Sequence, residues 1–527
     1  MRRPACSFAC LVLAAATAVL CAQTPSSRAP EPEARAARAY QSAVQGGPLS
    51  LRAFLAGFPK GADLHVHLSG AVYAETLIFD AGVDGLCVDT AALSFTAPPC
   101  DKPTVVLASR FTGNLSGADQ GLYDRLIDSF SMRGFVASPG LSGHDQFFST
   151  FGRFSGLSKR HTGEWVDEVA SRAAAQNQQY LELMETPPFT HAKAIAGEVG
   201  LGLNSAQPDF AQVRQALLDH GLRDEVAADR DDARSAETQR RQIERCGTLQ
   251  TAPACQVEVR YIYQISRGAP PEQVFAQALL GFETIQATMD AHEAGFVGIN
   301  FVQPEDGVIA MRDYTLQMKM LDYLHSVYPQ VHISLHAGEL APGLAPPEGL
   351  RFHIRQAVEL GHAERIGHGV DVMYEDDAPA LLQEMAQKHV MVEINLSSNE
   401  GILGVKGADH PFPLYRAAHV PVALSTDDEG VSRIDITHEY VRAALDYRLT
   451  YRDLKQLART GMEHDFLPGP SLWAVPDAFT TPAAPCKGSP LGSEKPAPAC
   501  GAFLDGSERA SAQWELERRF REFEARF

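Results

Sequence analysis

Short runs of mostly apolar residues recur along the chain, and most of them end in polar residues. They cover residues 62–68, 180–186, 257–266, 296–303, 331–339, 365–372, 390–399 and 420–429. Helix-like stretches such as TLQMKMLDYLHSVY and APALLQEMAQKH separate the later runs. This alternation of strands and helices predicts an α/β fold with a parallel sheet. Eight such units predict a closed (β/α)₈ TIM barrel, whose active site lies at the carboxyl ends of the strands.

The rest of the chain divides around this barrel. Residues 23–58 are expected to form a linker and a helix, and residues 59–470 the barrel itself. Two segments, near 82–150 and 200–255, do not follow the strand–helix alternation and are expected to be insertions. Residues 471–527 begin rich in Pro and Ala and end in SERASAQWELERRFREFEARF. This amphipathic ending predicts a C-terminal helix that docks on the barrel.

Composition narrows the class of protein. The 527 residues are 45% hydrophobic and 21% charged, which is typical of a globular protein. A net charge of −19 argues against nucleic acid polymers and anionic membranes as partners. Arg2 and Arg3 precede an uncharged apolar run over residues 8–22, which predicts a signal peptide at 1–22 and a periplasmic or secreted protein. A lipid anchor at Cys21 is the alternative.

Six cysteines remain once the signal peptide is removed, and they lie in three local clusters. An even number of cysteines in an exported protein predicts disulfides, and free buried thiols are the alternative. The clustering favours the pairs Cys87–Cys100, Cys246–Cys255 and Cys486–Cys500.

Histidines and a carboxylate gather at the predicted carboxyl ends of the strands. His65 and His67 in GADLHVHLSG are two residues apart, so their side chains point to the same face of a strand. His336 follows in HAGE and Asp427 in STDDEG. These ends converge on one face of a parallel barrel. Three imidazoles and one carboxylate suit a divalent transition metal, zinc first, with these four residues as its ligands.

Three further titratable residues accompany the predicted ligands. Glu339 stands in HAGE, His368 in GHG, and Asp428 beside Asp427. They supply a carboxylic acid, an imidazole and a carboxylate next to a metal that activates water. This set suits hydrolytic attack on a polarised C–N bond.

The motifs PKGADLHVHLSGA, HAGE, GHG and STDDEG, in this order, resemble the adenosine deaminase family of zinc hydrolases. The resemblance covers roughly residues 59–466. The export signal, the cysteines and the early insertion are similar to its secreted branch, the adenosine deaminase-related growth factors. The resemblance implies a (β/α)₈ barrel that converts adenosine or deoxyadenosine to inosine or deoxyinosine and ammonia.

Carried over by motif, the resemblance also implies a role for each residue. One zinc ion per chain is bound by the four ligands named above. Glu339 protonates the purine nitrogen N1, and burial is expected to raise its pKa so that it carries this proton. His368 orients the metal-bound water and helps to remove its proton, and the resulting hydroxide attacks C6. Asp428 accepts a hydrogen bond from the tetrahedral intermediate and contacts N7.

The predicted substrate contacts depart from the family pattern at two positions. The family usually carries an Asp at position 69, which contacts the ribose 5′-hydroxyl, and this chain has Ser69. Gln303 stands where the family usually has a Gly whose backbone N–H meets purine N3. Asn399, at the end of the seventh run, is expected to line the pocket or to cap a loop. These positions leave the sugar of the substrate open.

Several other functions were weighed against this one. A deaminase of adenine or of a modified adenine nucleoside keeps the chemistry, and a non-catalytic extracellular nucleoside-binding protein would keep only the pocket. A binuclear amidohydrolase often uses a bridging lysine at the fourth strand, and GINFVQPED has none. The cytidine deaminase type needs His-x-Glu together with Pro-Cys-x-x-Cys, and this pair does not occur in the chain.

Overall fold

The computed structural model describes residues 31–113, 115–202 and 208–527. The predicted signal peptide at 1–22 lies outside the described residues. Within the described ranges, no helix combines the length and the apolar character that a membrane crossing requires.

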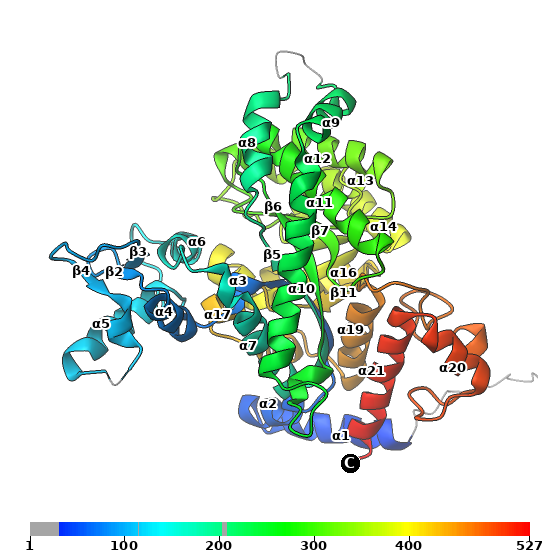
Figure 1. Cartoon of the computed structure of the whole chain (residues 1–527). Coiled ribbons are helices and arrows are strands. Elements are labelled where there is room, and N and C mark those ends of the chain that lie inside the picture. Colours follow the sequence, from blue (N-terminus) through cyan, green and yellow to red (C-terminus); the bar gives the residue numbers. More distant parts are fainter. Residues whose placement is uncertain (1–30, 114, 203–207) are drawn as a thin grey trace, which may run out of the picture.

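Eight parallel strands form the barrel in the order in which they occur along the chain, as the sequence predicts (Figure 1). They are β1 (Gly61–His67), β5 (Gln178–Glu185), β6 (Glu258–Ser266), β7 (Phe296–Val302), β8 (His332–Ala337), β9 (Arg365–His368), β10 (Met391–Ile394) and β11 (Val422–Leu424).

The first and last strands meet at a seam just beyond the end of β11. The backbone N–H of Asp427 donates to the His65 carbonyl at 2.8 Å, and the N–H of His67 donates to the Asp427 carbonyl at 3.3 Å. The Thr426 hydroxyl donates to the buried carboxylate of Asp63 at 2.8 Å. These bonds close the sheet on itself, so the structure is a TIM barrel.

Two predicted strands are shorter than the apolar runs that suggested them. The run at 420–429 gives only three residues of strand in β11, and the polar residues after it turn away to form the seam. The run at 390–399 splits into β10 and the helix α15 (Leu396–Leu403). Asn399 therefore lies in a helix and not at a strand end, because the polar LSSN sequence leaves the sheet as soon as β10 is complete.

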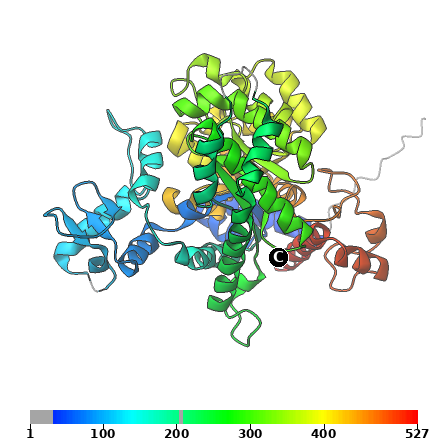
Figure 2. The same cartoon turned by 45° about the horizontal axis from the view of Figure 1, so that its top comes forward.

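Helices between the strands cover the outside of the barrel (Figures 1 and 2). Their starts have recognisable causes: proline stands in the first turn of α11 and α14, and α19 begins at a capping box between Thr450 and Asp453. The helices are α7 (Thr162–Ala175), α11 (Pro271–Asp290), α12 (Val308–Val327), α13 (His353–Glu359), α14 (Ala378–Lys388), α16 (Phe412–Ala417), α18 (Ile436–Asp446) and α19 (Tyr451–Glu463).

The first insertion forms a lobe on one side of the barrel, drawn in blue and cyan in Figures 1 and 2. It has its own apolar core, which includes Leu77, Phe95 and Phe130, and the Cys87–Cys100 disulfide. The excursion starts earlier than predicted, with a helix at Ala74, and its sheet is small and antiparallel. Its elements include α4 (Ala74–Val83), β2 (Cys87–Asp89), β3 (Ser94–Thr96), β4 (Val105–Leu107), α5 (Gly117–Ser129) and α6 (Gly143–Arg153).

A buried histidine ties this lobe to the start of α7. The His161 ring contacts Glu164 at 2.6 Å and Asp84 at 3.1 Å, and Asp80 lies 3.6 Å away. Burial alone lowers the pKa of His161, but the hydrogen bond to Glu164 and the charges of Asp80 and Asp84 outweigh it, so the pKa is raised above its ordinary value. The protonated ring is therefore the form that holds the lobe.

We expect the anchoring of this lobe to weaken as pH rises. Because the pKa of His161 is raised in the folded state, its contribution is complete below the unfolded pKa of about 6.5 and is lost as pH rises through the folded pKa. His161→Gln is expected to cost about 1–2 kcal/mol at pH 5.5 and less at pH 8.5. Urea unfolding at both pH values measures this, with His362→Gln, at an exposed ion pair, as the control. Equal losses at the two pH values would contradict the assignment.

The second insertion lies between β5 and β6 and is mainly helical. Its long helix α10 runs along the side of the barrel in Figure 1 and packs against α7 and α11. The Cys246–Cys255 disulfide closes the turn that follows α10. The other elements described here are α8 (Thr190–Val199) and α9 (Phe210–Asp219), with α10 at Val226–Ile243.

The two ends of the described chain meet at the amino-terminal side of the barrel. The C-terminal helix α21 (Glu508–Glu524) is capped by Ser507, as its sequence predicts. Phe520 and Phe523 pack their rings against Phe58, 5.6 and 5.8 Å away between centroids. α1 (Glu31–Gln45) and α2 (Pro48–Ala56) lie beside them, and the Pro/Ala-rich segment forms a second lobe with α20 (Pro498–Asp505) and the Cys486–Cys500 disulfide.

Candidate active site

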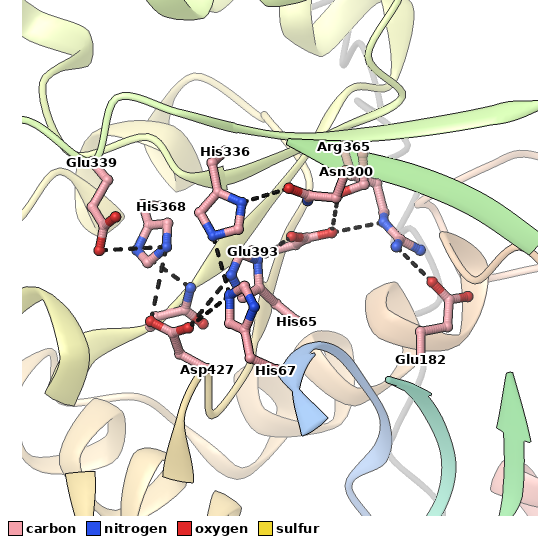
Figure 3. Close-up of polar contacts among 12 residues, drawn as sticks. His65, His67, Glu182, Asn300, His336, Glu339, Arg365, His368, Glu393 and Asp427 are labelled. Carbon is pink, nitrogen blue, oxygen red and sulfur yellow. Dashed lines mark hydrogen bonds and ion pairs between the residues drawn. The ribbon is translucent and has the colours of Figure 1, made fainter. Parts of the chain in front are cut away.

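The four predicted metal ligands converge at the carboxyl end of the barrel (Figure 3). β1 supplies His65 and His67 and β8 supplies His336, while Asp427 follows β11. The Nε2 atoms of His67 and His336 are 3.2 Å apart. One oxygen of Asp427, Oδ1, lies 3.3 Å from His67 Nε2 and 3.6 Å from His65 Nε2. All four side chains are buried.

Unusual backbone conformations aim two of the side chains in the site. Asp427 has a φ of +60° and His368 has a φ of +71°, both in the left-handed region that residues other than glycine rarely adopt. Such positions cost about 1–2 kcal/mol each and cluster at functional sites. Gly367 makes room for the first ligand, because a Cβ there would come within 2.6 Å of the His65 ring.

Each ligand histidine is held through its other ring nitrogen. Glu393 contacts Nδ1 of His65 at 2.6 Å, and the amide oxygen of Asn300 contacts Nδ1 of His336 at 2.6 Å. The side-chain nitrogen of Gln264 lies 2.5 Å from Nδ1 of His67, and its side-chain oxygen accepts the Thr186 hydroxyl at 2.8 Å. The acceptor oxygens of Glu393 and Asn300 place the proton on Nδ1 of His65 and His336 and leave their Nε2 atoms free to bind a metal.

The resulting arrangement fits a divalent metal. With Nδ1 protonated on His65 and His336, two Nε2 lone pairs point into one small space, and His65 Nε2 is buried there with no hydrogen-bond partner among the described residues. A cation is the natural occupant of such a site, since buried acceptors facing each other repel. Three imidazole nitrogens and one carboxylate are the donors that zinc prefers.

A row of buried charges continues from His65 toward the amino-terminal end of the barrel (Figure 3). Glu393 forms an ion pair with Arg365 Nε at 2.7 Å, and the same guanidinium reaches Glu182 at 2.5 Å. All three side chains are fully buried. The guanidinium also stacks over Phe466, 3.8 Å from the ring centroid. Together with Asp427 the row carries three carboxylates and one guanidinium, a net charge that a divalent ion balances.

We expect this ion row to control metal affinity. Arg365→Met removes the group that fixes Glu393, and Glu393 is the partner of His65. Changes to such supporting residues typically weaken metal binding by about 10–100-fold. Competition with a chromogenic chelator measures the zinc Kd. Arg459→Met is the matched control, because Arg459 pairs with Glu517 at 2.6 Å away from the row. An unchanged Kd in Arg365→Met would limit the row to a structural role.

Glu339 lies beside the ligands at the end of β8, and its carboxyl oxygen is 3.7 Å from His368 Nε2. Burial first, and then the charges of Asp427 and Glu305, raise the pKa of Glu339 well above its ordinary value. The expectation that burial raises this pKa is confirmed. The raised pKa favours the protonated carboxyl, which is the form that can give up a proton.

Glu305 fixes the loop that carries Glu339, which sequence reasoning missed. One of its oxygens accepts the Gly338 N–H at 3.0 Å and the other accepts the Glu339 N–H at 2.9 Å. The His353 ring contacts the same carboxylate at 2.5 Å and stacks on Tyr314, 3.8 Å between centroids. The position of Glu305 in QPED, shortly after a strand, is the only sequence signal for this role.

Asp428 lies next to Asp427 with the opposite protonation. Burial raises the pKa of Asp428 well above its ordinary value, and the neighbouring Asp427 charge adds to the rise. Burial also acts on Asp427, but His67, His368 and His65 outweigh it and lower its pKa. Gly70 allows Asp428 to approach β1, because a Cβ at position 70 would lie 1.6 Å from an Asp428 oxygen. The pair thus presents one carboxylate and one neutral carboxyl.

His368 faces Glu339 and Asp427 from the end of β9. Its Nε2 lies 3.8 Å from the second oxygen of Asp427. Burial lowers the pKa of His368 to about 3, helped by the neighbouring His65 and His67, so the ring is neutral. Nδ1 contacts the side-chain nitrogen of Asn399 at 2.9 Å. Asn399 therefore contacts a residue of the site directly.

The other two predicted substrate residues lie at the rim. Ser69 is exposed in the short helix α3 (Leu68–Ala71) that follows β1. Gln303 has φ +90°, and its side-chain oxygen accepts the Gly268 N–H at 2.8 Å. The side chain of Gln303 is thus tied to the loop after β6, and its backbone is left to meet a ligand.

Residues 164–479 match the adenosine deaminase family model, which is more than half of the chain. The chain belongs to the adenosine deaminase family. The matched range includes His336, Glu339, His368, Asp427 and Asp428 but begins after β1, so His65 and His67 join this set through the geometry of the barrel.

Comparisons with individual members of the adenosine deaminase family and with solved structures cover different shares of the chain. Adenosine deaminases of Salmonella heidelberg (strain SL476) and Salmonella schwarzengrund (strain CVM19633) are each 41% identical over 137 residues, 26% of this chain and 38% of theirs. The chain thus matches little more than a third of their length. Arabidopsis ADAL complexed with GMP is 19% identical with a TM-score of 0.49, covering 79% of this chain and 94% of that one. The adenine deaminase of Arthrobacter aurescens is 18% identical with a TM-score of 0.46, covering 77% and 94%.

Proposed function

We propose that this protein is a zinc-dependent hydrolase that deaminates adenosine or deoxyadenosine to inosine or deoxyinosine and ammonia. The observation that carries the proposal is the grouping, in one buried site, of four side chains that suit a metal with a carboxyl group at Glu339 whose pKa is raised. A non-catalytic nucleoside-binding protein would have no use for an acid held protonated beside a metal site. Membership of the adenosine deaminase family supports the same reaction class.

One zinc ion per chain would be held by His65, His67, His336 and Asp427. When bound, zinc supplies a water whose pKa is lowered toward neutrality, so that its deprotonation needs no strong side-chain base. The protein's own part is to orient the purine and to move protons at its ring nitrogens.

Each remaining residue of the site has a task that its chemistry permits. Glu339 donates its proton to N1, which leaves C6 open to attack by water. His368 orients the attacking oxygen. Asp428, neutral in the site, donates a hydrogen bond to an acceptor on the purine such as N7. The amino group leaves from the tetrahedral C6 as ammonia.

The sugar of the substrate is the finer part of the proposal. Ser69 is shorter than the Asp that the family usually carries, so it would reach a ribose 5′-hydroxyl only through water or not at all. The backbone of Gln303 is free to meet N3. Deamination of adenine or of a modified adenine nucleoside is the second candidate, favoured by the missing carboxylate at position 69.

We also propose that the protein acts outside the cytoplasm. Three disulfides, paired as the clustering predicts, suit an oxidising compartment. The signal peptide expected at 1–22 gives the route, and a lipid anchor remains the alternative. A labelled antibody against the C-terminal helix, applied to fractionated cells of the source, would find the protein in the exported fraction.

Product analysis tests the reaction and the substrate together. The mature protein would be incubated with zinc and, separately, with adenosine, deoxyadenosine, adenine and AMP, and ammonia and the hypoxanthine-type product quantified. Inosine from adenosine, absent in Glu339→Gln, supports the proposal. Turnover of adenine alone would move the substrate to the second candidate. Zinc binding without turnover of any purine would overturn the enzymatic proposal.

A further inference from the structure

Three groups that are not predicted metal ligands form a relay, a chain of hydrogen bonds that ends at His368. This relay determines which ring nitrogen of His368 donates and which accepts. It begins at the backbone N–H of Phe412, which donates to Nδ1 of His410 at 3.1 Å. A backbone amide can only donate, so Nδ1 of His410 carries no proton. His410 is buried, and burial, with the nearby Arg442, lowers its pKa to about 4. The neutral ring therefore has its proton on Nε2.

The second step passes this polarity to Asn399. Nε2 of His410 lies 3.0 Å from the side-chain oxygen of Asn399. Because Nε2 is a donor, the oxygen of the amide must face His410, and its NH₂ group must face the other way. An amide that could be turned either way on its own is thus fixed by a backbone group that cannot turn.

The third step reaches the site. The NH₂ group of Asn399 lies 2.9 Å from Nδ1 of His368, and the NH₂ group of Asn395 lies 3.4 Å from the same atom. Nδ1 of His368 faces two donors and is an acceptor. The neutral imidazole then carries its proton on Nε2, the atom that faces Glu339 and Asp427 at 3.7 and 3.8 Å.

We propose that His410 and Asn399 are positioning residues that hold His368 as a neutral Nε2–H donor toward the reacting oxygen. This inference rests on the proposed function for the meaning of that oxygen. It refines the role implied by the family resemblance, because Nε2 in this tautomer has no lone pair to receive a proton. His368 orients the oxygen by donating to it, and the polarity is set from the loop before α16, outside the site.

The tautomer can be read without substrate by long-range ¹⁵N–¹H correlation NMR on the ¹⁵N-histidine-labelled, zinc-loaded full chain. His368→Gln identifies the His368 signals among those of the 18 histidines. We expect wild-type His368 with Nδ1 unprotonated and Nε2 protonated. A wild-type spectrum with the proton on Nδ1 would overturn the inference, whatever the variants do.

Asn399→Asp is the sharpest variant, because it replaces the donor facing Nδ1 by an acceptor of the same shape. It is expected to move the proton of His368 to Nδ1 and to lower kcat by up to about 10⁴-fold, the loss seen when a catalytic histidine is held in the wrong tautomer. Ser398→Ala is the matched control, because Ser398 lies in the same helix and its hydroxyl has no hydrogen-bond partner among the described residues. This variant is expected to keep the wild-type tautomer of His368 and the wild-type kcat.

The outcomes separate this inference from the proposed function. If the wild type shows the expected tautomer but turns over no purine, the relay stands and the function fails. If purines are turned over and Asn399→Asp keeps the wild-type tautomer, the relay fails and the function stands. His410→Phe, which leaves the Asn399 amide free to turn, is expected to give a mixture of tautomers and offers a second reading should Asn399→Asp not fold.

Discussion

Glu339→Gln is expected to reduce kcat/KM for adenosine by about 10³-fold or more while zinc remains bound. Glutamine fills the same space and can still donate a hydrogen bond to N1, but it cannot transfer a proton, and general acid catalysis typically contributes about 10²–10⁴-fold. Glu339 is buried, its pKa is raised, and one of its carboxyl oxygens lies 3.7 Å from His368 Nε2. Steady-state assays with zinc content measured on the same sample test this.

The pH dependence of kcat/KM follows from the raised pKa of Glu339. The reaction uses the protonated form of Glu339, so kcat/KM is expected to fall as pH rises through its raised pKa. Glu305→Gln removes a negative charge near Glu339 and is expected to move this alkaline limb to lower pH. Glu364→Gln, at an exposed ion pair with His332, is the control. An alkaline limb that stays in place in Glu305→Gln would show that Glu305 acts only on the loop.

Removal of the metal is expected to abolish turnover and to leave the barrel folded. The core of the barrel is apolar and three disulfides lie outside the site, so the fold does not depend on the ion, whereas the proposed reaction does. Dialysis against a chelator, circular dichroism and metal analysis test this, and adding zinc back is expected to restore activity.

Asp427→Asn provides the matched variant for that experiment. The amide keeps the shape of the side chain but loses the charge that complements the cation. Zinc affinity and activity are expected to fall together in this variant, and zinc in excess is expected to recover part of the activity. Full activity in metal-free protein would contradict the proposed chemistry.

The strands of the barrel could be predicted because their apolar runs are long and separated by helices of distinct period. The sequence predicted roughly where the first insertion lies in the chain, but not its secondary structure. Its strands are only three residues long, too short for a period of two to emerge from the sequence. Asn399 was placed in a strand but lies in α15, because an apolar run in the sequence does not show where the chain leaves the sheet.

The convergence of the four predicted ligand residues could be predicted because they stand in recognisable motifs at the ends of strands. Their supports could not. Single charged residues stand within the apolar strands at Glu182, Arg365 and Glu393. The sequence alone does not distinguish a charged side chain buried inside the barrel from one exposed to solvent at the end of a strand. His410 lies in the loop before α16. Its bond to Asn399 depends on two segments that meet only in the folded chain.

The seam between β1 and the segment after β11 has a consequence for biosynthesis. His65 and His67 are among the first residues of the barrel to leave the ribosome, and Asp427 is among the last. The same residues close the sheet and complete the set of ligands, so a nascent chain offers a full metal site only when the barrel has closed. A metal bound by these residues would therefore report that the barrel has closed, and opening of the seam would disrupt the site before the rest of the sheet.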